Sequence, residues 1–515
     1  MSILEIKNLS HLYDSKPLFE NASLAVNNGE HSGVVGLNGA GKSTFVNIIA
    51  GSLPQDSGEV KWLNGIRRGY LDQHADIDRS LTVMEFLRGS FVHLFETEAR
   101  MNRLYGDMES LTDEKELDRM IQKANNLLDI LTREGFYDLD AAIKKVANGL
   151  GVNHFGYDTP ILQLSGGQRA KLLLAKLLLE KPDIMLLDEP TNFLDIEHIA
   201  WLVEFLNGFN GTFLVISHDT AFLDRVCRHI ISIENGSIKK YSGNYTQYRT
   251  QAEQNAKQYE DSYLRQQREI EKMEDYISRN SARAATAGMA NSRKKMLDKL
   301  DIIRKPTTVL DAEFSFPVSE LHTKDLLVVR DLKIGYGKPL LPPIDLHLDS
   351  ETKIWIRGTN GIGKTTLVKT LLGKIASLSG GFLWHPAVEI GYLEQDLIFN
   401  NEIQNAYSFF CDRFPRCNQK AVRAALAGVG IKNELALKPV ANLSGGEQVR
   451  IVLAVLMQKP SNVLVLDEPT NHLDVRAKTA LQQALREYKG AIILVSHEKE
   501  FAEGICTKVF DAKER

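Results

Sequence analysis

The chain has 515 residues, of which 43% are hydrophobic, so it is long enough for two or three domains with separate cores. Its formal net charge of −4 gives no overall attraction to nucleic acid, so any such attraction must come from a local patch. The sequence has no run of eighteen apolar residues, no signal-peptide pattern at its start and no Cys-x-x-Cys spacing among its four cysteines, which argues against a membrane span, a disulfide framework and a zinc site and favours the cytoplasm.

The first informative feature is a glycine-rich loop between a predicted strand at 33–35 and a predicted helix at 43–49. The loop consists of Gly36, Leu37, Asn38, Gly39, Ala40, Gly41, Lys42, Ser43 and Thr44. Its glycines allow backbone N–H groups to surround a phosphate, and the N-terminus of the following helix adds a partial positive charge. We therefore expect Lys42 to reach the β and γ phosphates of a nucleotide and Ser43 to hold Mg²⁺.

A predicted helical segment between about 82 and 137 follows, with apolar residues such as Phe91, Leu94 and Met101 at helical spacing. Gln73 and Ser165 lie 92 positions apart, whereas their counterparts in the second half, Gln395 and Ser444, lie only 49 apart. The 43 extra residues form one local insertion, which we interpret as a helical arm. The alternative is a decoration that packs on the domain.

The first half continues with Ser165, Gly166, Gly167 and Gln168, which follow Leu164. Apolar runs at 184–187 and 213–216 predict buried parallel strands. Asp188 ends the first run, where a carboxylate can hold a metal ion through water, and Glu189 comes next, placed to orient or deprotonate a water molecule. His218 follows the second run, which places it near the γ-phosphate, and Gln73 is expected to contact the metal and the water.

The segment from about 241 to 322 has a different pattern. Apolar residues recur at steps of three and four from Tyr245 to Ile277, and roughly 34 helical residues would span about 50 Å. We predict a helical hairpin with its tip near 279–293 and a shorter second helix that Pro306 stops. Residues 279–305 carry a net charge of +6 from Arg279, Arg283, Arg293, Lys294, Lys295, Lys299, Arg304 and Lys305 against Asp298 and Asp301. A solvated spacer helix is the alternative interpretation of this charge.

The second half, from about 323 to 515, repeats the first. Its glycine-rich loop consists of Gly358, Thr359, Asn360, Gly361, Ile362, Gly363, Lys364, Thr365 and Thr366. Its remaining motif residues are Gln395, Ser444, Gly445, Gly446, Glu447, Asp467, Glu468 and His497. The intervals agree to the residue. In both halves 37 positions separate the first Gly of the loop from the Gln. The signature Ser and the Asp at the strand end are 23 positions apart, and that Asp and the following His are 30 positions apart. The same roles are therefore expected, with Thr365 and Asp467 at the metal and Glu468 at the water.

These patterns predict two tandem α/β domains, each with a mostly parallel sheet, at 1–240 and 323–515, joined by a helical linker at 241–322. The Leu-Ser-Gly-Gly-Gln/Glu segments resemble the signature of ATP-binding cassette proteins. Two cassettes in one chain, an arm in the first and a charged linker of about 80 residues resemble the ABC-F proteins. The segments 241–248 and 290–300 match the entry and exit of that family's linker, and Pro-Thr-Asn-x-Leu-Asp after each Glu is also typical of it.

The resemblance implies an ATPase that uses Mg²⁺ at two composite sites, in a monomer whose cassettes form a head-to-tail sandwich. One ATP would lie between residues 36–44 and the signature at 444–447, and the other between 358–366 and 165–168. Tyr13 and Tyr336 match the aromatic residue that stacks on adenine in the family. The resemblance further implies binding to the ribosome, with rRNA and tRNA contacted through the linker and the arm and with no membrane partner. Some ABC-F proteins are translation factors, and others displace antibiotics from the ribosome.

Three other classes of cassette ATPase fit the sequence less well. The ATPase subunit of a transporter would dock on a membrane partner, but such subunits generally lack a long charged linker between their cassettes. A DNA-repair ATPase would have zinc cysteines or long coiled coils. The ribosome-recycling protein with iron–sulfur clusters would need more cysteines than four scattered ones.

Overall fold

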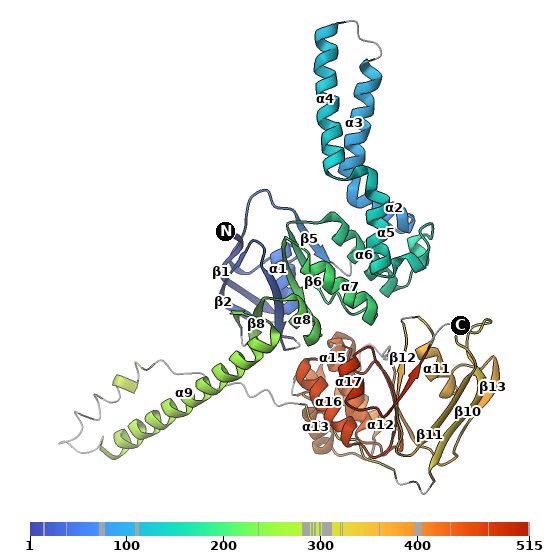
Figure 1. Ribbon diagram of the computed structural model, residues 1–515. Helices are drawn as coiled ribbons and strands as arrows, with labels where there is room; N and C mark the ends of the chain where they lie inside the picture. The colour runs from blue at the N-terminus through green and yellow to red at the C-terminus, as the bar shows by residue number, and fades with distance from the viewer. Residues whose placement is uncertain are drawn as a thin grey trace.

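The computed structural model in Figure 1 contains two α/β halves, a helical arm on the first half and a long helix that leads away from it. The structure describes the whole chain except residues 14–15, 38, 72–77, 109–112, 235, 281–288, 290–291, 293–294, 298–299, 301–311, 320, 322, 360, 396–403, 433, 472 and 513–515. Among the described helices, none combines the length and the apolar character that crossing a membrane requires.

The first half contains two sheets and the helices that cover them. Its strands are β1 (Ser2–Tyr13), β2 (Lys16–Asn27), β3 (His31–Gly36), β4 (Ser57–Trp62), β5 (Arg68–Leu71), β6 (Ile184–Asp188), β7 (Thr212–Ile216), β8 (His229–Glu234) and β9 (Ser237–Ser242). Its helices are α1 (Lys42–Ala50), α2 (Val83–Arg88), α3 (Val92–Met108), α4 (Glu114–Arg133), α5 (Leu139–Gly149), α6 (Gly166–Glu180), α7 (Ile196–Asn207) and α8 (Thr220–Val226). The main sheet has the order β5-β6-β7-β3-β8-β9, parallel except for β9, and a smaller antiparallel sheet has the order β2-β1-β4.

The second half repeats this plan with fewer residues. Its strands are β10 (Asp325–Lys333), β11 (Ile344–Asp349), β12 (Lys353–Arg357), β13 (Ser379–Trp384), β14 (Ile390–Leu393), β15 (Val463–Asp467), β16 (Ala491–Val495) and β17 (Lys508–Asp511). Its helices are α11 (Lys364–Leu371), α12 (Ala406–Arg413), α13 (Gln419–Gly428), α14 (Glu434–Leu437), α15 (Gly445–Leu456), α16 (Val475–Glu487) and α17 (Lys499–Glu503). The parallel sheet has the order β14-β15-β16-β12-β17, and β11-β10-β13 is antiparallel.

The apolar runs of the sequence become the central strands. All five residues of β7, β15 and β16 are buried, as the predicted two-sided burial of parallel strands requires. In both halves the strand before the glycine-rich loop lies inside the parallel sheet, the strand that leads to His lies beside it, and the strand that ends in Asp comes next. The carboxyl ends of three neighbouring strands therefore carry the motif residues to one edge of each sheet. The predicted fold class, two tandem α/β domains, is confirmed.

Helices α3 and α4 pack as an antiparallel hairpin that projects from the first half (Figure 1). The hairpin has a small core of its own, formed with the start of α5 by Leu94, Met101, Leu131 and Leu139. Residues 92–133 contain nine acidic and six basic side chains, so this arm carries a net charge of −3. The hairpin lies within the segment in which the sequence predicted an arm.

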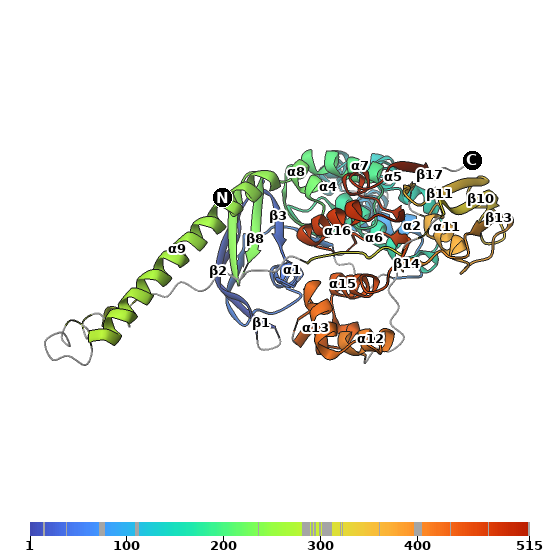
Figure 2. The same ribbon diagram turned by 90° about the horizontal axis from the view of Figure 1, so that it is seen from below.

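Helix α9 (Tyr245–Asn280) runs from the first half into open space in both views (Figures 1 and 2). Its 36 residues correspond to roughly 54 Å of helix at 1.5 Å per residue. Its first turn is fixed to the first half, because Asp224 of α8 accepts a hydrogen bond of 2.8 Å from the backbone N–H of Thr246. The hydroxyl of Tyr248, which is buried, lies 3.1 Å from Ser232 and donates to Glu234 at 3.0 Å. The base of α9 is thus part of the first half, and most of the predicted hairpin tip lies outside the described residues.

The last part of the segment 241–322 packs on the second half before the first strand of that half begins. Ala312, Phe314 and Phe316 belong to the core of the second half, and the ring of Phe316 meets that of Tyr488 edge-on at 6.4 Å. The backbone N–H of Ser461 donates to Pro317, and that of Ser319 donates to Ser461. This part of the segment 241–322 is therefore anchored to the second half.

Candidate functional site

The two glycine-rich loops join a buried strand to a helix. In the first loop Gly39 and Gly41 have φ values of 78° and 93°, and in the second Gly361 and Gly363 have φ values of 82° and 111°. These left-handed conformations are costly for residues other than glycine. No side chain caps the start of α1 or α11, because the N-cap residues are Gly41 and Gly363, so the first backbone N–H groups of both helices are available to an anion.

Each loop surrounds a buried lysine. The ammonium of Lys42 donates to the carbonyls of Gly36 and Leu37 at 3.0 and 3.1 Å, and that of Lys364 donates to Gly358 and Thr359 at 2.8 and 3.0 Å. Burial lowers the pKa of both lysines, and the nearest glutamate, Glu189 or Glu468, opposes that shift. A triphosphate in the loop would give each ammonium a strong anionic partner.

The strand ends β6 and β15 place Asp188 and Asp467 next to the loop hydroxyls. Burial raises the pKa of Asp467 to about 6, and the nearby hydroxyl of Thr365 opposes the rise. Both oxygens of Asp467 are buried and lack a well-formed hydrogen bond from the described residues. The Thr365 hydroxyl also donates to Gln395 at 3.2 Å. In the first half burial raises the pKa of Asp188, and the hydroxyl of Ser43 opposes it. Buried carboxylate, hydroxyl and amide oxygens together are the ligand set that suits Mg²⁺.

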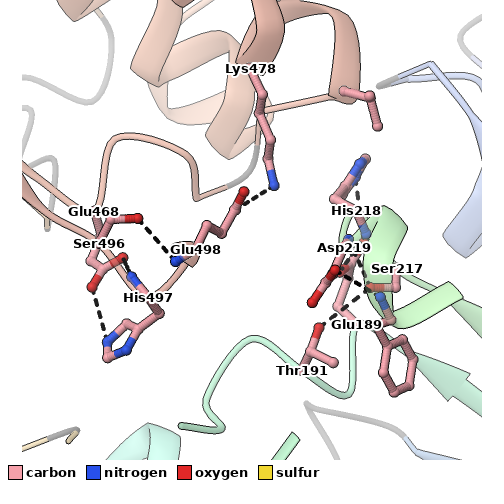
Figure 3. Close-up of polar contacts among 12 residues, drawn as sticks. Glu189, Thr191, Ser217, His218, Asp219, Glu468, Lys478, Ser496, His497 and Glu498 are labelled. Carbon is pink, nitrogen blue, oxygen red and sulfur yellow. Dashed lines mark hydrogen bonds and ion pairs between the residues drawn. The ribbon is translucent and has the colours of Figure 1, made fainter. Parts of the chain in front are cut away.

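Glu189 and Glu468 each meet a histidine from the neighbouring strand (Figure 3). The backbone N–H of His218 donates to one oxygen of Glu189 at 3.3 Å, and its ring Nε2 lies 3.4 Å from the other. The corresponding distances from His497 to Glu468 are 3.2 and 3.0 Å. Burial raises the pKa of Glu189 to about 8, the neighbouring Asp188 adds to the rise, and Lys42 opposes it. Each carboxyl is thus held in one orientation at the edge of the sheet.

The signature segments form the N-termini of α6 and α15. Ser165 and Gln168 exchange hydrogen bonds between side chain and backbone, and Ser444 and Glu447 do the same, so each helix begins with a capping box. The two serines therefore have a structural role at the helix start, and the glycines that follow leave the backbone accessible.

A cavity of about 1390 Å³ lies between the halves and brings together residues of both. Its first wall holds Gly39, Gly41, Lys42, Ser43, Thr44, Asp188, Glu189 and His218, and its second wall holds Ser444, Gly445, Gly446 and Glu447. The loop of the first half thus faces the signature of the second. At the other loop, Asp195 of the first half is close enough to Lys364 to act against the lowering of that lysine's pKa. Asp474 of the second half has the same effect on Lys42.

Several predicted residues have no described environment or lie elsewhere. Gln73, Asn38 and Asn360 fall outside the described residues, and nothing is known of the side chain of Tyr13. Tyr336 is 72% exposed and does not line the cavity. The two loops and the helix starts that follow them contain the predicted residues Gly36, Leu37, Ala40, Thr359, Ile362 and Thr366. Ser165, Gly166, Gly167 and Gln168 form the start of α6.

Two aspartates and their partners were missed as site residues. Lys171 lies 3.7 Å from Asp195, and Arg450 forms an ion pair with Asp474. Asp195 and Asp474 end the repeated Pro-Thr-Asn-x-Leu-Asp, and Lys171 and Arg450 each stand six positions after a signature serine. The repeat therefore contained a signal for both pairs, namely a basic residue and an acidic residue at matched positions.

The chain is similar in sequence to several known proteins. A family model described as ABC transporter matches residues 19–192 and 341–471, and a second model with the same description matches 231–316. The chain is 42% identical over its whole length to the uncharacterized ABC transporter ATP-binding protein YfmM of Bacillus subtilis, and covers 99% of it. It is 33% identical to ABC transporter F family member 2 of Arabidopsis thaliana, over 99% of this chain and 76% of that protein.

Solved structures share the fold at low sequence identity. The archaeal ribosome recycling factor aABCE1, in complex with ribosomal stalk protein aP1, matches with a TM-score of 0.59 at 20% identity, over 98% of this chain and 87% of that one. A model of ribosome-bound archaeal Pelota and ABCE1 matches with a TM-score of 0.58 at 19% identity, over 99% of this chain and 76% of that one.

Proposed function

Because the chain belongs to the ABC-F group of ATP-binding cassette proteins and is an ATPase, we propose that it binds the ribosome and uses ATP hydrolysis to act on translation. The proposal joins two parts of the molecule, the nucleotide sites between the halves and the basic linker at the end of α9. The ribosome would place the protein in the cytoplasm.

The residues around the cavity would divide the ATPase chemistry among them. Lys42 and Lys364 would bind the β and γ phosphates, and Ser43, Asp188, Thr365 and Asp467 would hold Mg²⁺, which neutralises charge on the phosphates when bound. Glu189 and Glu468 would orient or deprotonate the attacking water, with His218 and His497 fixing their carboxyl groups. The signature helix of the opposite half would present its backbone N–H groups to the same γ-phosphate. Tyr13 and Tyr336 would stack on adenine, and Gln73 and Gln395 would contact the metal and the water.

The observation that carries the ribosome assignment is the position of α9. This helix starts on the first half and leads the chain roughly 54 Å away from it, toward the segment with a net charge of +6. Phosphate groups of RNA bind such a segment because the released counterions favour association. Two structures with this fold are of complexes with a ribosomal stalk protein or with the ribosome, and we propose the same class of partner for this chain, with rRNA and tRNA at the linker.

The arm offers a different surface. The family resemblance implies RNA contacts through the arm as well, but the net charge of −3 on the arm opposes contact with RNA phosphates. We therefore assign the phosphate contacts to the linker and propose that the arm contacts a more basic part of the ribosome. The cassettes themselves would act as a monomer, since one chain contains both loops and both signatures.

Sedimentation tests the assignment. The variant with both Glu189→Gln and Glu468→Gln, incubated with ATP and cell extract and layered on a sucrose gradient, should migrate with ribosomes. The variant with Lys42→Ala and Lys364→Ala, which has weakened phosphate binding, is the matched control and should stay at the top. Migration with membranes would instead identify a transporter ATPase, and migration with neither would contradict the proposal.

Growth assays then separate the two kinds of ABC-F function. Loss of a translation factor should slow growth without drugs, whereas loss of an antibiotic-protection protein should change growth only in the presence of a ribosome-targeting antibiotic.

A further inference from the structure

The two halves differ in charge at a position that faces the ATP sites. Lys478 lies on α16, four residues after Asp474, and its counterpart in the first half, four residues after Asp195, is Ile199. The side chain of Lys478 is only 13% exposed and lines the same cavity as Glu189 and His218 of the other half. A largely buried ammonium requires an anionic partner, so its surroundings are informative.

Lys478 donates a hydrogen bond of 2.6 Å to Glu498, the residue directly after His497. Figure 3 shows its ammonium between this glutamate and the Glu189–His218 pair. Lys478 and Glu189 line the same cavity from opposite halves, so the ammonium faces the carboxyl group of Glu189 across the interface. One lysine of the second half therefore stands between the histidine loop of one ATP site and the glutamate of the other.

The partner of Lys478 differs between the halves in the same way. Asp219, which corresponds to Glu498, caps α8 by accepting from the N–H of Phe222 at 2.9 Å. Glu498 has a longer side chain and makes no such cap on α17, so it is available to Lys478. The first half thus combines Ile199 with a capping Asp219, and the second combines Lys478 with a reaching Glu498. This paired difference indicates that the lysine and the glutamate act together.

We propose that Lys478 is a positioning residue for Glu189, and that it makes the two ATP sites unequal. When the halves close on ATP, the ammonium would hold the carboxylate of Glu189 toward the attacking water. Glu498 would hold Lys478 in place while the halves are apart. Glu468 would receive no such help from Ile199, so the site built from Lys42 and Ser444 should hydrolyse ATP faster than the site built from Lys364 and Ser165.

The first test measures steady-state ATPase of the purified full-length protein. Lys478→Met should lower kcat about tenfold, which corresponds to the loss of one charge-assisted contact, and should leave KM within about twofold. Lys478→Arg keeps the charge and should recover most of the loss. An unchanged kcat in Lys478→Met, or a loss that Lys478→Arg shares in full, would overturn the proposal. Lys61→Met, which removes a lysine from an exposed pair with Glu59, is the matched control.

The second test assigns the effect to one site with double-mutant cycles, measured as single-turnover hydrolysis. In a Glu189→Gln background, Lys478→Met should cost little more, because its target has already lost its charge. In a Glu468→Gln background, where only the site of Glu189 turns over, the full loss should remain. The reverse pattern would mean that Lys478 acts through Glu498 on His497, and equal losses in both would indicate a structural role. Ribosomes are absent from both tests, so their outcome does not depend on the ribosome assignment.

Discussion

Glu189 and Glu468 are held in a backbone conformation that their side chains do not favour. Their φ values are 47° and 49°, in the left-handed region, where a residue other than glycine costs about 1–2 kcal/mol. Each is kept there by a hydrogen bond of 2.9 Å from its own N–H to the neighbouring strand, at Ile216 or Val495. The same strain at the same position in both halves indicates that it serves the direction of the carboxyl group.

Replacement of both glutamates by glutamine tests their chemical role. The double variant Glu189→Gln/Glu468→Gln should retain ATP binding, since the lysines and loops are unchanged. Its turnover rate should fall by a factor of about 10²–10⁴. Steady-state ATPase and equilibrium nucleotide binding measure the two quantities separately. In cells the variant should remain in its ATP-bound state and block translation and growth. Wild-type turnover in the double variant would remove these glutamates from the mechanism.

The motif residues of the two sites could be predicted from the sequence because each belongs to a local pattern. A glycine loop between a strand and a helix places Lys42 and Ser43 without knowledge of the rest of the fold. The repeat places Lys171 with Asp195 and Arg450 with Asp474 at matched positions, but the effect of each aspartate on the lysine of the opposite loop depends on how the halves face each other. The unusual φ of Glu189 was also beyond prediction, since its sequence neighbours contain no glycine that would signal a left-handed turn.

At the scale of elements, helix α9 shows how far a hydrophobic pattern reaches. The stripe from Tyr245 to Ile277 predicted one long helix, and the structure has a helix at Tyr245–Asn280. The segment that contains Phe314 and Phe316 was assigned to the linker, although alternate residues there are buried in the second half. Apolar residues alternate with other residues in this segment of the sequence. The half on which the segment packs, however, depends on contacts with residues more than a hundred positions away.

The basic segment after α9 leads to a prediction at the same scale. Changing Arg293, Lys294 and Lys295 to Glu should preserve folding and ATP binding, because the cassettes bind nucleotide without these residues. Ribosome association should weaken, and its salt dependence should fall by about one log unit for each lost phosphate contact. Sedimentation over a range of salt concentrations measures both effects, and complementation measures the activity in translation.

A matched control separates the linker from net charge. Changing Lys338, Lys420 and Lys508 to Glu alters the charge of the chain by the same amount at exposed positions of the second half. This variant should bind ribosomes as the wild type does. If the linker variant also binds and complements fully, the linker is only a spacer between the cassettes.

At the scale of the whole molecule, the two halves face each other so that each completes a site in the other. The cavity joins the loop of the first half to Ser444 of the second. Asp474 of the second half opposes the lowering of the pKa of Lys42, and Asp195 of the first half does the same for Lys364. Neither half by itself brings a phosphate loop and a signature helix together in this way. The intact chain is therefore the smallest unit expected to hydrolyse ATP by the proposed mechanism.

This reciprocal arrangement predicts which double variants are additive. Lys42→Ala and Ser444→Arg disable the same site, so together they should cost little more ATPase activity than either alone. Lys42→Ala and Ser165→Arg disable different sites, so together they should remove nearly all activity. Both pairs of changes combine one loop residue with one signature residue, so they differ only in which sites they disable. Lys364→Ala combined with Ser165→Arg or with Ser444→Arg provides the mirror-image control. The opposite pairing of losses would mean that each half uses its own signature, which is incompatible with a cavity whose walls come from both halves.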